Sequence, residues 1–465
     1  MKKTFLLFLT TIFSLSSFAQ EIVGQWNGAL DIQGIQLRLI FKVTKSENGY
    51  SATMDSPDQG AKDIPVTQTV YENPKIKFVI ANAGIEYSGI LNHGQFVGTL
   101  KQAGMEFPLN LSRESIVKQT ILRPQEPNKP FPYISKDVSF KNGNAGITLS
   151  GTLSLPKETG SFPAVVLISG SGPQNRNHEL FGHKPFLIIS DYLTKNGIAV
   201  LRFDDRGVGQ SQGDFKSATT HDLANDVESA VSYLKTLKEI DQDKIGLIGH
   251  SEGGIIAPMV ATRTTDVKFI VLLAGTGIPG DELLLLQQET IARSNGVSED
   301  KIQRSLKMNS QIFKIIKESS DEQTLKRDLS SFMKEVLTEE NTDQIPNGMS
   351  KEQFISTQVE QISSPWTKYF LKLDPTIALE KVKCPVLALN GEKDLQVSSG
   401  VNLKAISASV KKGGNMRVTT RSYPDLNHLF QRSETGLPTE YASISQTFSP
   451  KVLTDITNWI LNQTN

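Results

Sequence analysis

A serine lies in a glycine-rich turn between two apolar stretches of the 465-residue chain. The segment KIGLIGHSEGGIIAPMVATR is typical of a buried strand, a sharp turn and the start of a helix, with Ser251 in the turn. Gly249 and Gly253 complete a Gly-x-Ser-x-Gly pattern, because a side chain flanking the serine would clash in so tight a turn. This strained turn exposes the hydroxyl, so we predict that Ser251 is a nucleophile rather than part of an ordinary glycine-rich turn.

A serine hydroxyl needs a base to take its proton, and in this setting the partners follow in the order serine, acid, histidine. Of the six histidines, only His428 lies downstream of Ser251, in the loop segment YPDLNHLF after the last predicted strand. The acid is expected at the end of the preceding strand, where PVLALNGEKDLQV supplies two carboxylates. We choose Asp394 to orient the imidazole, and Glu392 and Asp425 are the alternatives.

Acyl transfer also needs hydrogen-bond donors for the oxyanion, and here we expect backbone amides to supply them. One is the amide of Glu252, the residue after the nucleophile. The second is expected in GSGPQNRN, after the strand AVVLIS, where Ser171 is the favoured donor and Gly172 follows it. We therefore assign Ser171 and Glu252 to the oxyanion hole and place Gly172 in the substrate pocket.

Aromatic residues in SPWTKYFLKLDP precede the point where the chain returns to the predicted sheet. Trp366, Tyr369 and Phe370 either line an acyl pocket or pack a lid onto the core, and the two interpretations are equally supported. We assign Trp366 and Phe370 to the substrate pocket. Metal-ligand spacings, a phosphate-binding loop and a dinucleotide motif are absent from the sequence, so we expect no metal and no cofactor.

Charged residues also follow a strand in LRFDDRGVGQS, close to where substrate would lie. Asp204, Asp205 and Arg206 either form an arginine–carboxylate pair that fixes this loop or contact the substrate. We favour the structural pair, because a bidentate interaction of this kind orders a loop without any ligand.

The chain predicts two domains of different construction. Residues 20–115 carry short alternating apolar runs broken by glycine and asparagine, which indicates an all-β domain, and GQWNGALDI around Trp26 is similar to the opening strand of a lipocalin-like barrel. Residues 116–135 form a proline-rich linker. Residues 136–465 alternate strands with helices, which predicts a mostly parallel α/β sheet, and residues 278–378 are predicted to be a helical cap insertion.

The first residues have the pattern of a secretory signal peptide. Two lysines precede an apolar run that ends in small residues, so we expect residues 1–19 to be removed and the protein to be periplasmic or secreted. The rest of the sequence holds no apolar stretch that would span a membrane. Basic and acidic residues balance at 49 each, which gives no reason to expect nucleic acid as a partner. The single cysteine, Cys384, is interpreted as a packed residue and not a nucleophile.

Several ordered motifs together resemble a known family. Residues 136–465 are similar to the α/β-hydrolase superfamily, and in particular to exported bacterial carboxylesterases with an extra N-terminal β-domain, relatives of the prolyl-oligopeptidase-like serine hydrolases. The motifs that carry the resemblance are ISGSGPQNRN, LRFDDRGVGQS, GHSEGG, PVLALNGEKDLQV and NHLFQ. The resemblance implies an esterase for short acyl esters with Ser251, Asp394 and His428 as its triad. The oxyanion loop departs from the family, because Ser169 stands where a histidine is usual.

These observations predict a serine hydrolase that cleaves small-molecule carboxylic esters through an acyl-enzyme. One alternative is an exopeptidase or aminopeptidase that uses the same triad. Another is a non-catalytic protein in which the β-domain binds a ligand. The natural substrate and the oligomeric state stay open.

Overall fold

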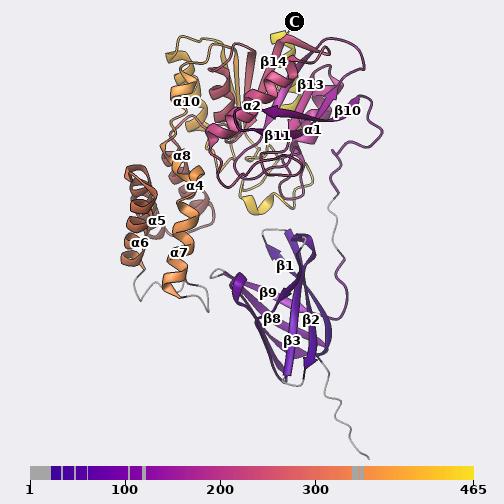
Figure 1. Cartoon of the computed structure of the whole chain (residues 1–465), viewed down its shortest axis with the longest axis vertical. Coiled ribbons are helices and arrows are strands. Elements are labelled where there is room, and N and C mark those ends of the chain that lie inside the picture. The colour runs from indigo at the N-terminus through magenta and orange to yellow at the C-terminus, as the bar shows by residue number, and fades with distance from the viewer. Residues whose placement is uncertain are drawn as a thin grey trace, which may run out of the picture. The chain divides into compact units, whose positions relative to one another are not determined.

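The computed structural model describes residues 22–32, 35–46, 49–59, 61–102, 105–117, 122–337, 345 and 350–464. The predicted signal peptide lies outside the described residues. The chain forms two compact units, whose main boundary falls between residues 118 and 119 (Figure 1). Within the described ranges, no helix combines the length and the apolar character needed to cross a membrane.

The N-terminal unit consists of two antiparallel sheets. The first has the order β1-β2-β3-β4 and the second has the order β5-β6-β7-β8-β9. The strands are β1 (Gly24–Ile32), β2 (Ile35–Ser46), β3 (Gly49–Ser56), β4 (Ala61–Pro65), β5 (Gln68–Glu72), β6 (Lys75–Ile80), β7 (Ile85–Asn92), β8 (Gln95–Gln102) and β9 (Met105–Leu111). Along these strands buried and exposed side chains alternate, as in the burial of β6, which confirms the all-β prediction for this region.

Aromatic side chains fill the interior of the N-terminal unit. Phe41 stacks on Phe78 with 4.6 Å between ring centroids, and Trp26 lies 4.4 Å from Phe96. Tyr87 is completely buried beside Phe41 and Phe78. Rings of this size contribute most of the apolar area that a small β unit can bury.

The two sheets meet where the unit begins and ends. Asn27 of β1 and Ser112 after β9 exchange backbone hydrogen bonds of 2.7 and 2.9 Å. Beside them the Arg113 guanidinium lies 3.9 Å from the centre of the Trp26 ring, a cation–π contact. This bridge joins the sheets, but a continuously paired barrel is not shown.

The second unit is built on one mixed sheet with the strand order β10-β11-β13-β12-β14-β15-β16-β17. Its strands are β10 (Ile134–Asn142), β11 (Ile147–Leu155), β12 (Phe162–Ile168), β13 (Ala199–Phe203), β14 (Ile240–His250), β15 (Val267–Leu273), β16 (Val386–Gly391) and β17 (Val418–Tyr423). β11 runs antiparallel to β10 and β13, and the pairings from β13 through β17 are parallel. This order and direction confirm the predicted α/β-hydrolase fold class.

Helices cover both faces of this sheet (Figure 1). α2 (Thr220–Lys235), α3 (Gly253–Ala261) and α10 (Ser399–Lys412) pack on one face, and α1 (Pro185–Lys195) and α11 (Pro450–Thr464) pack on the other. Along β12, Ala164 and Val166 enter the first core while Val165 and Leu167 enter the second. Because both faces are buried, the strand reads as a continuous apolar run in the sequence.

A group of helices is inserted between β15 and β16. The helices described there are α4 (Gly280–Ser294), α5 (Glu299–Glu318), α6 (Glu322–Val336), α7 (Lys351–Ile362), α8 (Pro365–Lys372) and the short α9 (Thr376–Leu379). Figure 1 shows α4 to α7 gathered beside one another, in orange and brown. Leu325, Leu329, Ile355 and Val359 form a buried cluster of their own there, so this insertion has its own core.

Candidate active site

Ser251 occupies the turn between β14 and α3 in a left-handed backbone conformation, with φ of 54°. This conformation is strained for a residue with a side chain, and its backbone N–H is held by the carbonyl of Leu273 at 2.9 Å. A Cβ on Gly249 would lie 1.9 Å from the carbonyl oxygen of Gly253, and a Cβ on Gly253 would lie 2.3 Å from that of Ile168. The steric clash predicted for a side chain at either glycine therefore holds in the structure.

His428 and Asp394 form a buried pair on the loops that follow β17 and β16. Nδ1 of His428 lies 2.8 Å from Oδ2 of Asp394. The other carboxylate oxygen of Asp394 accepts the backbone N–H groups of Gln396 and Val397, each at 2.8 Å. An ionised carboxylate only accepts hydrogen bonds, so Nδ1 of His428 carries a proton and Nε2 is left as the basic nitrogen.

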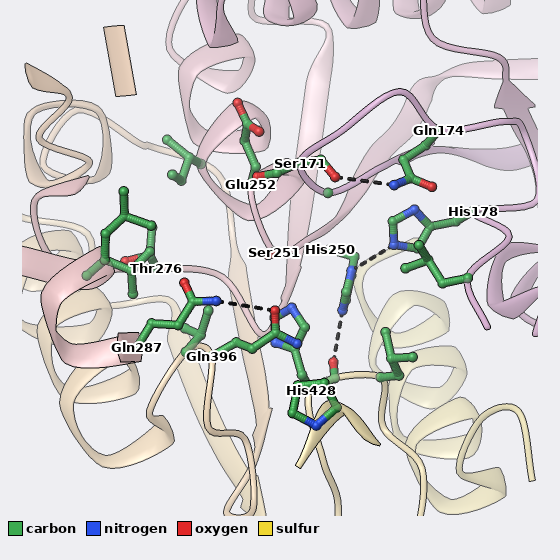
Figure 2. Close-up of a pocket in the computed structure, with 18 of the residues that line it drawn as sticks. Ser171, Gln174, His178, His250, Ser251, Glu252, Thr276, Gln287, Gln396 and His428 are labelled. Carbon is green, nitrogen blue, oxygen red and sulfur yellow. Dashed lines mark hydrogen bonds between the residues drawn. The ribbon is translucent and has the colours of Figure 1, made fainter. Parts of the chain in front are cut away.

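Ser251 and His428 line the same cavity, which has a volume of about 400 Å³ (Figure 2). The two predicted oxyanion residues, Ser171 and Glu252, also line it, as do Trp366 and Phe370. Asp394 reaches the cavity through His428. Among the described residues, Ser251 and His428 make no side-chain hydrogen bond to each other in this structure, a feature common in enzymes without bound substrate.

The backbone N–H groups of Ser171 and Glu252 donate to no other backbone group within the described residues. Gly170 directly precedes Ser171, and a Cβ there would approach the Cβ of Ser251 to 3.0 Å. The glycine thus lets the loop that contains Ser171 come close to Ser251.

Asp205 holds the loop of residues 169–174 in place through hydrogen bonds at both of its ends. Its carboxyl oxygens lie 2.8 Å from the Ser169 hydroxyl and 2.9 Å from the backbone nitrogen of Gln174. The backbone N–H of Asp205 in turn donates to the carbonyl of Gln174 at 3.0 Å. Burial raises the pKa of Asp205 to about 7, because the charged form loses its hydration.

Two further histidines support the backbone of His428. Nε2 of His250 lies 2.9 Å from the carbonyl oxygen of His428, so this nitrogen must carry the proton. Burial lowers the pKa of His250 well below its usual range, which leaves its Nδ1 as an acceptor for the Nε2–H of His178 at 3.1 Å. Burial likewise lowers the pKa of His178 to about 3. Both rings are therefore neutral. The carbonyl oxygen of His428 fixes the tautomer of His250, and His250 in turn fixes that of His178. Figure 2 shows the two contacts.

Glu252 joins the turn at the nucleophile to the inserted helices. Its buried carboxyl accepts the indole N–H of Trp366 at 2.9 and 3.0 Å and the hydroxyl of Thr220 at 2.6 Å. Burial raises the pKa of Glu252 above its ordinary value. Trp366 stacks on Phe370 with 4.7 Å between ring centroids. The two aromatic residues thus line the cavity and also pack α8 against the core.

Other residues singled out in the sequence lie elsewhere. Gly172 is in the oxyanion loop but is not among the residues that line the cavity. Arg206 forms the structural pair that we favoured, but its partner is Asp226 of α2, with Nε–Oδ2 and Nη2–Oδ1 distances of 2.7 and 2.9 Å. Cys384 lies just before β16, and burial raises its thiol pKa to about 11, which does not suit a nucleophile.

Sequence reasoning missed the supporting roles of Asp205, His250 and His178. For His250 a signal existed, because it directly precedes Ser251 at the end of the same predicted strand. The roles of Asp205 and His178 depend on contacts between distant loops, which spacing alone does not reveal.

Comparison with known proteins places most of the second unit in a family. Residues 116–418 match the model of the X-Pro dipeptidyl-peptidase (S15) family, a stretch that includes Ser251 and Asp394 and ends before His428. The chain is 26% identical over 339 residues to esterase EstD of Thermotoga maritima, which covers 71% of this chain and 68% of the relative. It is 30% identical over 154 residues to an uncharacterized protein of Pseudomonas aeruginosa, which covers 32% of this chain and 39% of the relative.

Among solved structures, the esterase Pf2001 of Pyrococcus furiosus is similar, with a TM-score of 0.42 and 17% identity over 72% of this chain and 96% of that one. The family model spans well over half of the sequence. The chain therefore belongs to the X-Pro dipeptidyl-peptidase (S15) family and is an α/β-hydrolase enzyme.

Proposed function

We propose that this protein is a carboxylesterase in which Ser251, His428 and Asp394 act as a catalytic triad on short acyl esters. The observation that carries the proposal is the 2.8 Å contact between His428 Nδ1 and Asp394, beside a cavity that also exposes a serine on a strained turn. The similarity to esterase EstD supports ester hydrolysis as the reaction.

The first half of the reaction transfers the acyl group to the enzyme. Ser251 Oγ bonds to the ester carbonyl carbon while His428 Nε2 takes the proton of the Ser251 hydroxyl. The carbonyl oxygen becomes an oxyanion, which accepts the N–H groups of Ser171 and Glu252. His428 then gives the proton to the leaving alkoxide as the carbon–oxygen bond breaks, so that an alcohol departs and Ser251 is acylated.

The second half regenerates the enzyme with water. His428 takes a proton from a water molecule whose oxygen attacks the acyl carbon. The bond from this carbon to Ser251 Oγ breaks, the proton returns to Oγ and a carboxylic acid leaves. Asp394 stays ionised throughout and stabilises the imidazolium that forms in each half.

Turnover of p-nitrophenyl acetate by wild-type protein and by Ser251→Ala tests the proposal. We expect the variant to lose activity while its circular dichroism and unfolding midpoint stay close to wild type. A folded Ser251→Ala protein that keeps its esterase activity would rule the triad out.

The family description gives a second candidate, a peptidase that removes an X-Pro dipeptide. Such a substrate presents a free ammonium group, which an available carboxylate would bind. Glu252 is the only carboxyl side chain among the described residues that line the cavity, and its oxygens already accept Trp366 and Thr220. We therefore rank ester hydrolysis first.

The ratio of kcat/KM for p-nitrophenyl acetate to that for Ala-Pro-p-nitroanilide decides between the two candidates. We expect a large ratio in favour of the ester. A higher kcat/KM for the dipeptide substrate would establish the peptidase instead.

A further inference from the structure

A second cavity, of about 1100 Å³, lies apart from the catalytic one within the second unit. The segment that precedes β10 forms one side through Phe131 and Tyr133. Arg176 and Arg202 also line the cavity, from the loop after β12 and from β13. None of the described residues that line this cavity also lines the catalytic one.

Arg202 is a buried cation without a carboxylate partner. Arg202 is 5% exposed, and it forms no salt bridge among the described residues. Its Nη1 donates to the amide oxygen of Asn177, and its Nε is buried without any hydrogen-bond partner. Burial lowers the pKa of Arg202 to about 10, which reflects the cost of keeping this charge out of water.

Two other largely buried arginines, Arg176 and Arg206, each pair with a carboxylate. Arg176 is held by Asp204 at 2.7 Å and by Asp137 at 3.1 Å, and Arg206 is held by Asp226 at 2.7 Å. The acids that line the second cavity, Asp137 and Asp204, both contact Arg176, and neither forms an ion pair with Arg202. Arg202 therefore brings a positive charge to the cavity wall that no carboxylate of the described residues contacts directly.

The segment before β10 adds a flat apolar surface to the cavity wall. The rings of Phe131 and Tyr133 stack with 5.1 Å between centroids and 4° between planes. Nζ of Lys129 lies 5.8 Å from the Phe131 ring and adds a second positive charge at the same side. A cavity lined by both a cation and stacked rings suits an anion that carries a planar apolar body.

We propose that this cavity binds a small organic carboxylate with a flat apolar body, whose carboxylate pairs with Arg202 and whose body lies along Phe131 and Tyr133. The site is separate from the catalytic cavity and does not depend on the esterase proposal. Arginine is the residue best suited to this task, because its planar fork can donate two parallel hydrogen bonds to a carboxylate.

Thermal unfolding of the full-length protein with sodium benzoate tests the proposal, with benzyl alcohol and inorganic phosphate as comparison probes. A ligand that binds only the folded state raises the unfolding midpoint in proportion to its occupancy. Benzoate should raise the midpoint of the wild type, and benzyl alcohol and phosphate should raise it less. An equal effect of phosphate would contradict the planar body, and an equal effect of benzyl alcohol would contradict the role of charge.

The Arg202→Met variant tests whether benzoate binds beside Arg202 and whether the unpaired Arg202 side chain destabilises the fold. Without ligand, its midpoint should equal or exceed that of the wild type, because an apolar side chain of similar length replaces a charge that has no partner. Benzoate should bind this variant about 10- to 100-fold more weakly, the change expected when a charge-assisted hydrogen bond is lost.

Arg206→Met is the matched control, because that arginine is equally buried but paired with Asp226. Its midpoint without ligand should fall, while its response to benzoate should persist. A destabilised Arg202→Met protein, or one with an unchanged response to benzoate, would overturn the proposal.

Discussion

The interior of the N-terminal unit and the catalytic edge of the hydrolase sheet are opposite solutions to burial. In the first, rings such as Phe41, Phe78 and Tyr87 are buried and pack against one another. At the second, the strained Ser251 lines a cavity, and the buried carboxyl of Asp205 holds the loop beside it. The comparison shows that the destabilising features of this chain lie at the candidate active site. Backbone strain and buried ionisable groups commonly gather at functional sites.

Ser251→Ala is the sharpest way to test this contrast. Removing the nucleophile should lower kcat for p-nitrophenyl acetate by about 10⁶-fold while leaving the fold intact. Serine and alanine are both strained at a positive φ. The free energy of unfolding should therefore change by less than about 1 kcal/mol on substitution. Steady-state kinetics and urea unfolding measure the two effects.

Asp394→Asn should lower kcat by about 10⁴-fold. The amide can donate a hydrogen bond to Nδ1 of His428, which would place the proton on Nε2, where the base must be free. The kcat measured against pH checks this, and a loss of less than tenfold would show that Glu392 or Asp425 takes the role.

Phe78→Ala tests the other side of the comparison. Its ring stacks on Phe41 and lies in a full interior, so the substitution should cost the N-terminal unit about 3–5 kcal/mol. The described residues that line the catalytic cavity all belong to the second unit, so kcat/KM should not change. A large fall in kcat/KM would show that the N-terminal unit contributes to catalysis.

His250→Leu should lower kcat by about 10- to 100-fold with little change in KM. The substitution leaves the carbonyl of His428 and the Nε2–H of His178 without their partner, so the imidazole base loses its fixed position. His250→Gln keeps a donor and should recover part of the loss. Equal activity in both variants would show that the ring only fills space.

Asp205 gives the most specific prediction, a dependence of stability on pH. Its pKa is about 7 in the folded state and 3.8 when unperturbed, so the folded protein binds a proton that the unfolded chain releases between these values. The free energy of unfolding contributed by Asp205 therefore falls as pH rises from about 4 to about 7, by at most about 1.4 kcal/mol per pH unit.

Asp205→Asn removes this titration. Its amide can still accept the N–H of Gln174 and donate to Ser169, so the oxyanion loop should keep its shape. Urea unfolding at a series of pH values should show the wild type losing stability relative to the variant across that window. Parallel stability curves would contradict the raised pKa.

The sheet and the candidate triad could be predicted because each depends on a local pattern. Buried strands read as apolar runs, and parallel strands bring their carboxyl ends to one edge, where Ser251, Asp394 and His428 follow β14, β16 and β17. The steric need for Gly249 and Gly253 is also local, since it follows from the turn itself.

The remaining features depend on contacts that no local pattern encodes. Arg206 was expected to pair with a carboxylate of its own loop, but Asp226 of α2 lies closer once the helix packs on the sheet. The bond between His178 and His250 joins a loop to a strand end 72 residues away. For the same reason the missing partner of Arg202 becomes visible only when its surroundings are known.

Reaction with a fluorophosphonate, followed by peptide mass spectrometry, tests the central claim most directly. The reagent modifies only a serine that a nearby base has activated. We predict one phosphonyl group per chain, located on Ser251, and loss of esterase activity in step with labelling. A label on another residue, or full activity after Ser251 is labelled, would contradict the account.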